Sequence, residues 1–261
     1  MLLLCVLLLG CREAESAREP LPLNVLPNNS AYASYINEDI GSGFSMNLRF
    51  YHDVADTYNI TDITLLPVTD IVTLDDFNVT DLGVVNGVSL QGLGVSMIAE
   101  SPGTHTFTDI EMTANGATVT LPLGKLRTTV ATEKRAEFLS ISRQVGGSFR
   151  ESHPLDFTVE NDSDKSAVVK DVLVEHPHIY FDAQDIIINP LWDVEPLPIE
   201  GLTIHPGESV NLQLDWEVGM PGEGPINMEA RPLLVVEEEG ELRFLEFINT
   251  IFRRDPAAPE T

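Results

Sequence analysis

Basic residues are scarce in this sequence. It holds 15 Lys and Arg against 41 Asp and Glu, a formal net charge of −26 at pH 7, and residues 50–124 include no Lys or Arg at all. Proteins bind nucleic acids and anionic lipid head groups through clustered Lys and Arg, so the composition excludes both kinds of basic-patch partner. The acids are scattered and do not follow metal-ligand spacing, which favours a solubilising acidic surface over cation binding along this stretch.

Cysteine and recognisable catalytic motifs are also nearly absent. The 261 residues include two cysteines, Cys5 and Cys11. The sequence has no Gly-x-Ser-x-Gly elbow and no Ser-x-x-Lys motif, which are arrangements that activate a nucleophile. Paired carboxylates of the glycosidase kind need a cleft, and a small β-sandwich offers little depth for one. The sequence therefore predicts a protein that is not an enzyme.

Helical periodicity is missing from almost the whole chain. Only residues 130–139 form a passable helical stretch; elsewhere Val, Ile, Leu, Thr and Phe alternate with polar residues between Gly, Pro, Asn and Asp. The clearest hairpin turns at Asn115-Gly116, two residue types that tolerate positive φ. Pairing outward from this turn places three apolar pairs on one face: Ala114 with Ala117, Met112 with Val119, and Ile110 with Leu121.

Two parts of the chain share one order of features, namely strand, polar turn, strand and Pro. They cover residues 44–67 and 155–177, and this repetition predicts two tandem β-sandwiches. The predicted division is a signal peptide at 1–10, a tether at 11–20, a first β-sandwich domain at 21–131, a linker at 132–148, a second β-sandwich domain at 149–253 and a tail at 254–261.

The first eleven residues are an apolar run that ends in Leu8-Leu9-Gly10-Cys11 and is followed by the polar Arg12. The run is too short to span a bilayer but suits the apolar core of a secretion signal. Its ending resembles the lipobox of bacterial lipoproteins, although no Lys or Arg precedes it. The resemblance implies that residues 1–10 are removed and that acylated Cys11 holds the mature protein on a membrane. In an envelope with two membranes it implies the outer one, because Arg12 and not Asp follows the cysteine.

The second unit resembles the immunoglobulin-like domains of bacterial surface lipoproteins. The residues that carry this resemblance are Phe157-Thr-Val-Glu-Asn-Asp-Ser163 and Ile204-His-Pro-Gly-Glu-Ser-Val210. It implies a fold class and no ligand, because such domains host unrelated functions. The expected fold is all-β, with two tandem immunoglobulin-like β-sandwiches after an N-terminal lipoprotein signal peptide.

Two clusters are candidate metal ligands. His176 and His178 flank Pro177 and would project to one face of an extended segment, where two imidazoles begin a metal site. A pair of loop histidines beside a proline is the alternative. Asp162 and Asp164 resemble the opening of a calcium loop, but the Gly and the distal Glu of such a loop are missing. A turn held by Asx side chains explains them as well.

The two tryptophans call for different interpretations. Trp216 is in phase with the apolar face of a strand and is predicted to lie in the core. Trp192 sits in a Pro-rich loop, where an exposed ring would serve as an interface anchor or a platform for a sugar. Packing of Trp192 over the end of the sandwich is the alternative.

These observations predict a lipid-anchored cell-envelope protein that acts as a non-enzymatic interaction or assembly module. Its expected partners are the membrane, through Cys11, and envelope proteins, with no nucleic acid. No cofactor is expected beyond weak Ca²⁺ binding at Asp162 and Asp164. The alternative function is a lipoprotein that captures a carbohydrate or a divalent metal for a transporter.

Overall fold

The computed structural model describes residues 23–36, 43–132, 134–189, 195–220 and 222–256. Apart from a single turn of 3₁₀ helix, η1 (Ala183–Asp185), the regular structure of these residues is β, which confirms the all-β prediction. Within the described part of the chain, no helix has the length and apolar character needed to cross a bilayer. The helix predicted at 130–139 is wrong. Residues 130–131 end a strand whose side chains alternate between buried and half-buried, residues 134–135 form another strand, and Leu139 begins a third.

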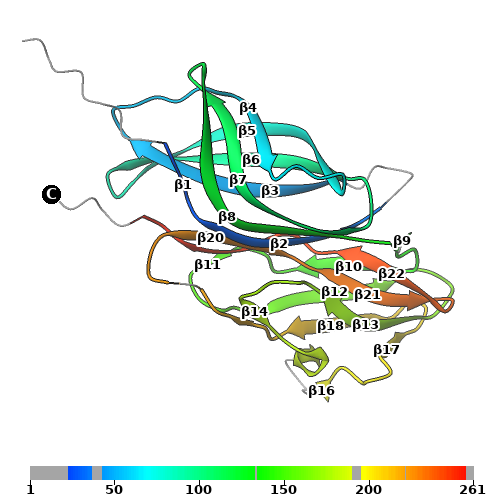
Figure 1. Cartoon of the computed structure of the whole chain (residues 1–261). Helices are drawn as coiled ribbons and strands as arrows, with labels where there is room; N and C mark the ends of the chain where they lie inside the picture. Colours follow the sequence, from blue (N-terminus) through cyan, green and yellow to red (C-terminus); the bar gives the residue numbers. More distant parts are fainter. Residues whose placement is uncertain (1–22, 37–42, 133, 190–194, 221, 257–261) are drawn as a thin grey trace, which may run out of the picture.

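Two facing sheets enclose the core of the first half, at the top of Figure 1. The first sheet has four strands in the order β1-β3-β6-β5, with bounds β1 (Asn24–Val25), β3 (Gly43–Asp53), β6 (Val88–Ala99) and β5 (Val72–Val85). The facing strands belong to a seven-stranded sheet and are β2 (Asn28–Tyr35), β8 (Ala117–Ala131), β7 (Gly103–Ala114) and β4 (Ile60–Leu66). Met46, Leu93 and Phe107 are among the side chains buried between the two layers.

The hairpin predicted at Asn115-Gly116 is confirmed as β7–β8. Asn115 has φ 51° and Gly116 has φ 80°, as a type I′ turn requires. The structure has the three predicted pairs in register, together with Glu111 opposite Thr120. Pro122 precedes Gly124, where β8 begins to pair with β2, so its missing N–H breaks no bond between β8 and β2.

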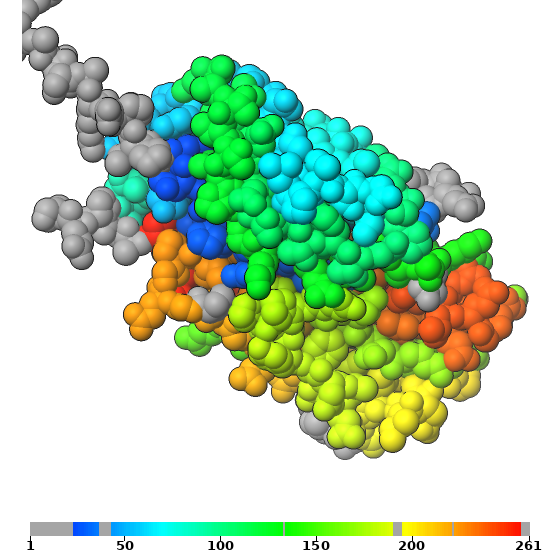
Figure 2. All heavy atoms as spheres, viewed as in Figure 1, coloured from blue at the N-terminus to red at the C-terminus, as the bar shows by residue number. Residues whose placement is uncertain are grey.

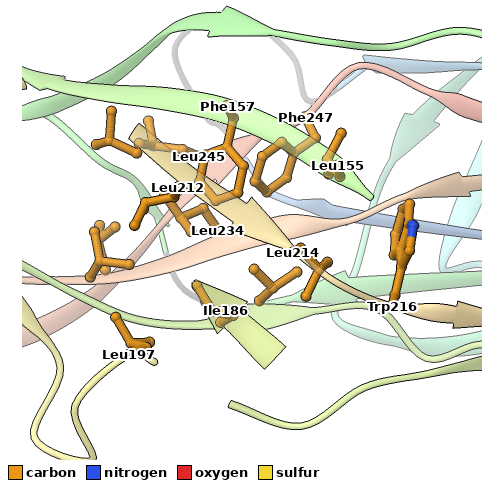
Figure 3. Close-up of a cluster of buried hydrophobic side chains, with 14 of the residues drawn as sticks. Leu155, Phe157, Ile186, Leu197, Leu212, Leu214, Trp216, Leu234, Leu245 and Phe247 are labelled. Carbon is orange, nitrogen blue, oxygen red and sulfur yellow. The ribbon is translucent and has the colours of Figure 1, made fainter. Parts of the chain in front are cut away.

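Two further layers form the second half. One sheet runs β10-β12-β18-β15-β16, with bounds β10 (Leu139–Gln144), β12 (Leu155–Asn161), β18 (Ser209–Leu214), β15 (Ile186–Ile188) and β16 (Glu195–Pro196). The other runs β17-β13-β21-β22-β9, with bounds β17 (Leu202–Ile204), β13 (Ala167–Leu173), β21 (Leu233–Glu238), β22 (Glu241–Glu246) and β9 (Lys134–Arg135). A short pair, β14 (Ile179–Tyr180) and β19 (Glu217–Val218), lies beside them. Figure 3 shows the core of this half, with Phe157 against Phe247 and Trp216 at one end.

The seven-stranded sheet contributes to both halves. Its order is β11-β23-β20-β2-β8-β7-β4, and its remaining strands are β11 (Ser148–Phe149), β23 (Thr250–Arg254) and β20 (Ile226–Arg231). Strand β2 pairs in parallel with β8 on one side and with β20 on the other. Tyr32 of β2 belongs to the first core, while Met228 of β20 and Phe252 of β23 belong to the second. A single hydrogen-bonded sheet therefore runs from one core to the other.

The predicted linker at 132–148 contains paired strands. Within it, β9 pairs with β22 and β10 pairs with β12. Residues of the two predicted sandwich ranges, 21–131 and 149–253, meet in the seven-stranded sheet where β2 pairs with β20. Whether these ranges fold as separate domains stays a prediction, which calorimetry can test.

Candidate interaction surface

Two of the residues singled out from the sequence, Cys11 and Trp192, lie outside the described residues. Their predicted roles, lipid attachment for Cys11 and surface contact for Trp192, stay predictions. Trp216 is buried, as predicted, with 2 % of its surface exposed, and its indole Nε1–H donates to the backbone oxygen of His153 at 2.6 Å.

The histidine pair is held by contacts within the protein. His176 is buried, and its Nε2–H donates to the backbone oxygen of Asn29 at 2.5 Å, while Nδ1 accepts the backbone N–H of His178 at 3.0 Å. Burial lowers the pKa of His176 to about 4, so the imidazole is neutral near pH 7. With both ring nitrogens engaged, His176 joins a loop of the second half to strand β2 of the first.

The loop that carries Asp162 and Asp164 is organised by the preceding asparagine. Asn161 accepts the Ser163 N–H at 3.1 Å and donates to the backbone oxygens of Lys165 at 2.8 Å and Ile204 at 2.9 Å. This is the Asx-held turn that the sequence left as an alternative. Both aspartates are exposed.

No group of three or more His, Cys, Asp and Glu side chains in the described residues could hold a metal ion. His176, His178, Asp162 and Asp164 therefore do not form one metal site. Metal binding by fewer of them, including weak Ca²⁺ binding at the two aspartates, stays a prediction.

A shallow hollow of about 600 Å³ lies on the surface beside the buried Trp216. It is lined by an exposed ring, a half-buried ring and four carboxylates, which come from Tyr180, Phe181, Asp182, Asp185, Asp215 and Glu217. The carboxylate of Asp182 caps η1 by accepting the Gln184 N–H at 2.7 Å. An open, acidic hollow with one exposed phenol ring offers hydrogen-bond acceptors and an apolar face to a polar ligand.

The first half is open along one side, where two sheets end. Strand β4 ends the seven-stranded sheet and β5 ends the four-stranded sheet, and both lie at the top of Figure 1. Between them lies a groove of about 200 Å³. Apolar side chains line most of it, with Val68 as its most exposed wall at 72 %; the others are Ile63, Leu65, Val72, Leu74, Met97 and Phe107.

Strand β5 borders this groove and is exposed over most of its length. From Asn78 to Val84 every residue is exposed, including the apolar Val79, Leu82 and Val84. Three aspartates, Asp75, Asp76 and Asp81, lie along the same strand and are also exposed. We name the outer edge of β5 and the adjoining groove the open side of the first half.

A buried polar network, which sequence reasoning missed, joins the two halves. The Glu229 carboxylate on β20 is fully buried and accepts the Tyr32 hydroxyl. It also accepts the backbone N–H of Asn47 at 3.1 Å and the Asn47 side-chain N–H at 2.9 Å. Burial raises the pKa of Glu229 and raises that of Tyr32 well above its usual value. One feature of the sequence could have indicated this network: the acidic Glu229 lies in the middle of a short strand.

Neighbouring side chains also connect the two halves, because they donate hydrogen bonds to backbone oxygens of β3. Asn227 donates to the Asn47 backbone oxygen at 3.0 Å, and Asn249 donates to that of Ser45 at 3.0 Å. Unpaired strand edges are satisfied in this way when they are covered by another part of the fold. In Figure 2 the green atoms of the first half rest on the yellow-green and orange atoms of the second, and Arg127 forms an ion pair with Glu175 across this boundary. The network therefore connects the two halves at β3. The open side lies at the other end of the four-stranded sheet, at β5.

Comparisons with solved structures find matches of very low overall similarity. Tandem immunoglobulin repeats of Dlar match with 13 % identity and a TM-score of 0.23, over 89 % of this chain and 97 % of that one. Fibronectin(III)-like modules of Clostridium thermocellum CbhA match with 6 % identity and a TM-score of 0.19, over 92 % and 97 % of the two chains. The C-terminal domain of the Streptococcus agalactiae AgI/II polypeptide BspA matches with 7 % identity and a TM-score of 0.20, over 89 % and 100 %.

The TM-scores of these three matches lie between 0.19 and 0.23. Scores of this size carry no argument about function. No protein-family profile matches the chain, and no curated protein matches it. The architecture therefore rests on the strand pairing described above, and function has to be argued from surfaces.

Proposed function

We propose that this protein is a non-enzymatic interaction or assembly module of a bacterial cell envelope, anchored to a membrane through acylated Cys11. The observation that carries the proposal is the open side of the first half. There a 14-residue strand ends its sheet with exposed apolar and acidic side chains. Exposed apolar side chains beside a groove are typical of a surface that another molecule covers.

The joined halves suit such a role. The shared sheet and the Glu229 network hold the second half against β3, on the side of the four-stranded sheet opposite to β5. The second half therefore supports the first without covering its open side. A tether of about ten residues after Cys11 would hold the body off the membrane surface.

Anchoring is tested by a single substitution. Cys11→Ser removes the acylated residue, and we expect it to release a folded protein from the membrane fraction of a bacterial host, while the unsubstituted chain stays in that fraction. Ser16→Ala, a change in the tether, serves as the matched control and is expected to leave fractionation unchanged. Retention of the Cys11→Ser chain in the membrane fraction would contradict the anchoring proposal.

Interaction is tested by crosslinking in the native cells. A photocrosslinking residue at Thr80, which is exposed on β5, and another at Ser140, which is exposed on β10, report on the two halves. We expect discrete crosslinked species that contain envelope proteins. The absence of any such species from either position would argue against an interaction module.

The hollow beside Trp216 keeps ligand capture as a second candidate function. Its exposed Tyr180 ring and its carboxylates are suited to polar ligands such as carbohydrates. A ligand that binds only the native state raises the melting temperature. A rise of several degrees with one sugar or divalent cation, lost in Tyr180→Ala but kept in the matched Tyr51→Ala, would favour this function over the first.

A further inference from the structure

The outer edge of β5 is free along the described chain. Strand β5 pairs with β6 alone, and the order of its sheet places it last. One backbone group of β5 is satisfied locally, because the Gly83 N–H donates to the Asp81 carboxylate at 2.8 Å. Such an edge presents unpaired N–H and C=O groups to any other extended chain.

The side chains of β5 leave this edge accessible. Two of them lie back over glycines of β6: a Cβ on Gly92 would lie 3.3 Å from the Leu82 side chain, and one on Gly94 would lie 2.3 Å from the Asn78 side-chain oxygen. Because these side chains cover β6, they do not cover the outer edge. Val79 and Val84 remain exposed, at 38 % and 65 %.

Charge decides which kind of chain fits the edge. Asp75, Asp76 and Asp81 line β5, and no Lys or Arg occurs between residues 50 and 124 to offset them. A second copy of this edge would bring two sets of these carboxylates together, which repulsion between like charges opposes. An extended segment with Lys or Arg side chains would instead be attracted to the same strand.

The groove supplies a place for an apolar side chain. It lies between β5 and β4 and is lined by Leu65, Leu74 and Phe107 among others. Side chains alternate between the two faces of an extended chain. A segment that alternates basic and apolar residues would direct one set toward the aspartates and the other toward the groove.

We propose that the outer edge of β5 binds an extended segment of a partner protein by strand addition, and that this segment carries alternating basic and apolar residues. Backbone hydrogen bonds to β5 supply the affinity. The aspartates and the groove supply the selectivity. The proposal deepens the interaction function and rests on it.

The test uses the full chain in mild detergent and a fluorescent twelve-residue peptide that alternates lysine with valine. A second peptide has the same sequence with alternate backbone nitrogens methylated, so its charge is unchanged but it cannot donate to a strand edge. We expect the first peptide to bind and to protect residues 72–85 from hydrogen exchange. The methylated peptide should bind at least about tenfold more weakly, as loss of several backbone hydrogen bonds implies.

Variants distinguish binding of the peptide at the β5 edge from general electrostatic attraction of a basic peptide to an acidic protein. Asp75→Asn, Asp76→Asn and Asp81→Asn together should weaken binding about tenfold or more, at about 1.4 kcal/mol per tenfold. The matched control is a triple substitution on the second half with the same charge change: Asp156→Asn, Glu160→Gln and Asp162→Asn. It should change binding less than about twofold, because those groups lie on another sheet and its loop.

Three results would overturn the inference: equal binding of the two peptides, equal weakening by the two triple variants, or protection outside residues 72–85. Failure of the peptide test together with crosslinks to envelope proteins from Ser140 would keep the interaction function and remove the β5 edge as its site. Loss of crosslinks from both positions would count against the interaction function itself.

Discussion

Glu229 and His176 are buried ionisable residues at the boundary between the halves, and they give stability opposite dependences on pH. The folded pKa of Glu229 lies above its unfolded value of 4.5, so the folded state binds its proton more tightly. The folded pKa of His176, about 4, lies below its unfolded value of 6.5, so the folded state binds its proton more weakly. Stability depends on this difference in bound protons.

For Glu229, the stability of the native chain falls as the pH rises from about 4.5 through the raised pKa. The side chain introduced by Glu229→Gln does not titrate. We therefore expect the melting temperature of the variant, relative to that of the native chain, to increase as the pH is raised from 4 to 7.5. The groups that act on Glu229 from neighbouring strands are the neutral Tyr32 hydroxyl on β2, which donates to it, and the charged Arg49 on β3. Thermal melts over this range test the sign, with the exposed Glu111→Gln as control; a constant difference between variant and native chain would contradict the assignment.

For His176, stability is fully present above pH 6.5 and is lost as the pH falls toward about 4. At about 1.36 kcal/mol per pKa unit, the loss is on the order of 3 kcal/mol. We expect His176→Gln to be less stable than the native chain near pH 7, because the bond to Asn29 is weakened, and to lose less stability on acidification. Urea unfolding at several pH values measures this, with the exposed His205→Gln as control. A parallel loss in His176→Gln and the native chain would show that another group titrates.

At the scale of elements, the close approach of β2 to β8 depends on a glycine. Gly124 has φ +94°, and a Cβ there would lie 2.3 Å from the Asn28 backbone oxygen. Gly116 has a similar φ of +80° at the hairpin turn, but a Cβ there would meet nothing within 4 Å. The two glycines therefore share a conformational requirement and differ in the space around them.

We expect Gly116→Ala to cost about 1 kcal/mol, the strain of an alanine at positive φ. Gly124→Ala should cost on the order of 3 kcal/mol or more, because β2 must also move away from β8. Denaturant unfolding of the two variants tests the difference. Equal costs would mean that β2 does not need to approach β8 so closely.

On the scale of the whole molecule, the shared sheet should couple the two halves during unfolding. Removal of the first half would leave β20 without its β2 neighbour, and removal of the second would uncover the β3 backbone that Asn227 and Glu229 cap. Both changes replace hydrogen bonds between the halves with hydrogen bonds to water, and each lost bond removes roughly 0.5–1.5 kcal/mol of net stabilisation.

We therefore expect one main calorimetric transition for the whole chain, with the calorimetric and van't Hoff enthalpies in agreement. Gly124→Ala, which acts on the first half, should lower the temperature of the entire transition. Two separate transitions, with only one shifted by Gly124→Ala, would show instead that the predicted ranges 21–131 and 149–253 unfold as independent domains.

Local pattern alone determined much of this protein. The Asn115-Gly116 hairpin, the buried phase of Phe157 and Trp216, and the all-β class follow from side-chain alternation and turn chemistry, which act between near neighbours in the chain. The acidic charge between residues 50 and 124 is likewise a property of composition, although the sequence does not say which of these acids lie on a free strand edge.

The tertiary structure alone decided how the halves join and which edge is left open. Strand β2 is rich in Asn, Ser and Ala and carries little hydrophobic signal, yet it is buried because β8 and β20 flank it in parallel. Its bond to Glu229 spans 197 residues, and no local periodicity encodes a contact at that separation. The position of β5 at the end of its sheet is decided in the same way. A strand lies at an edge when no other strand pairs with its outer side, and this depends on where distant parts of the chain pack.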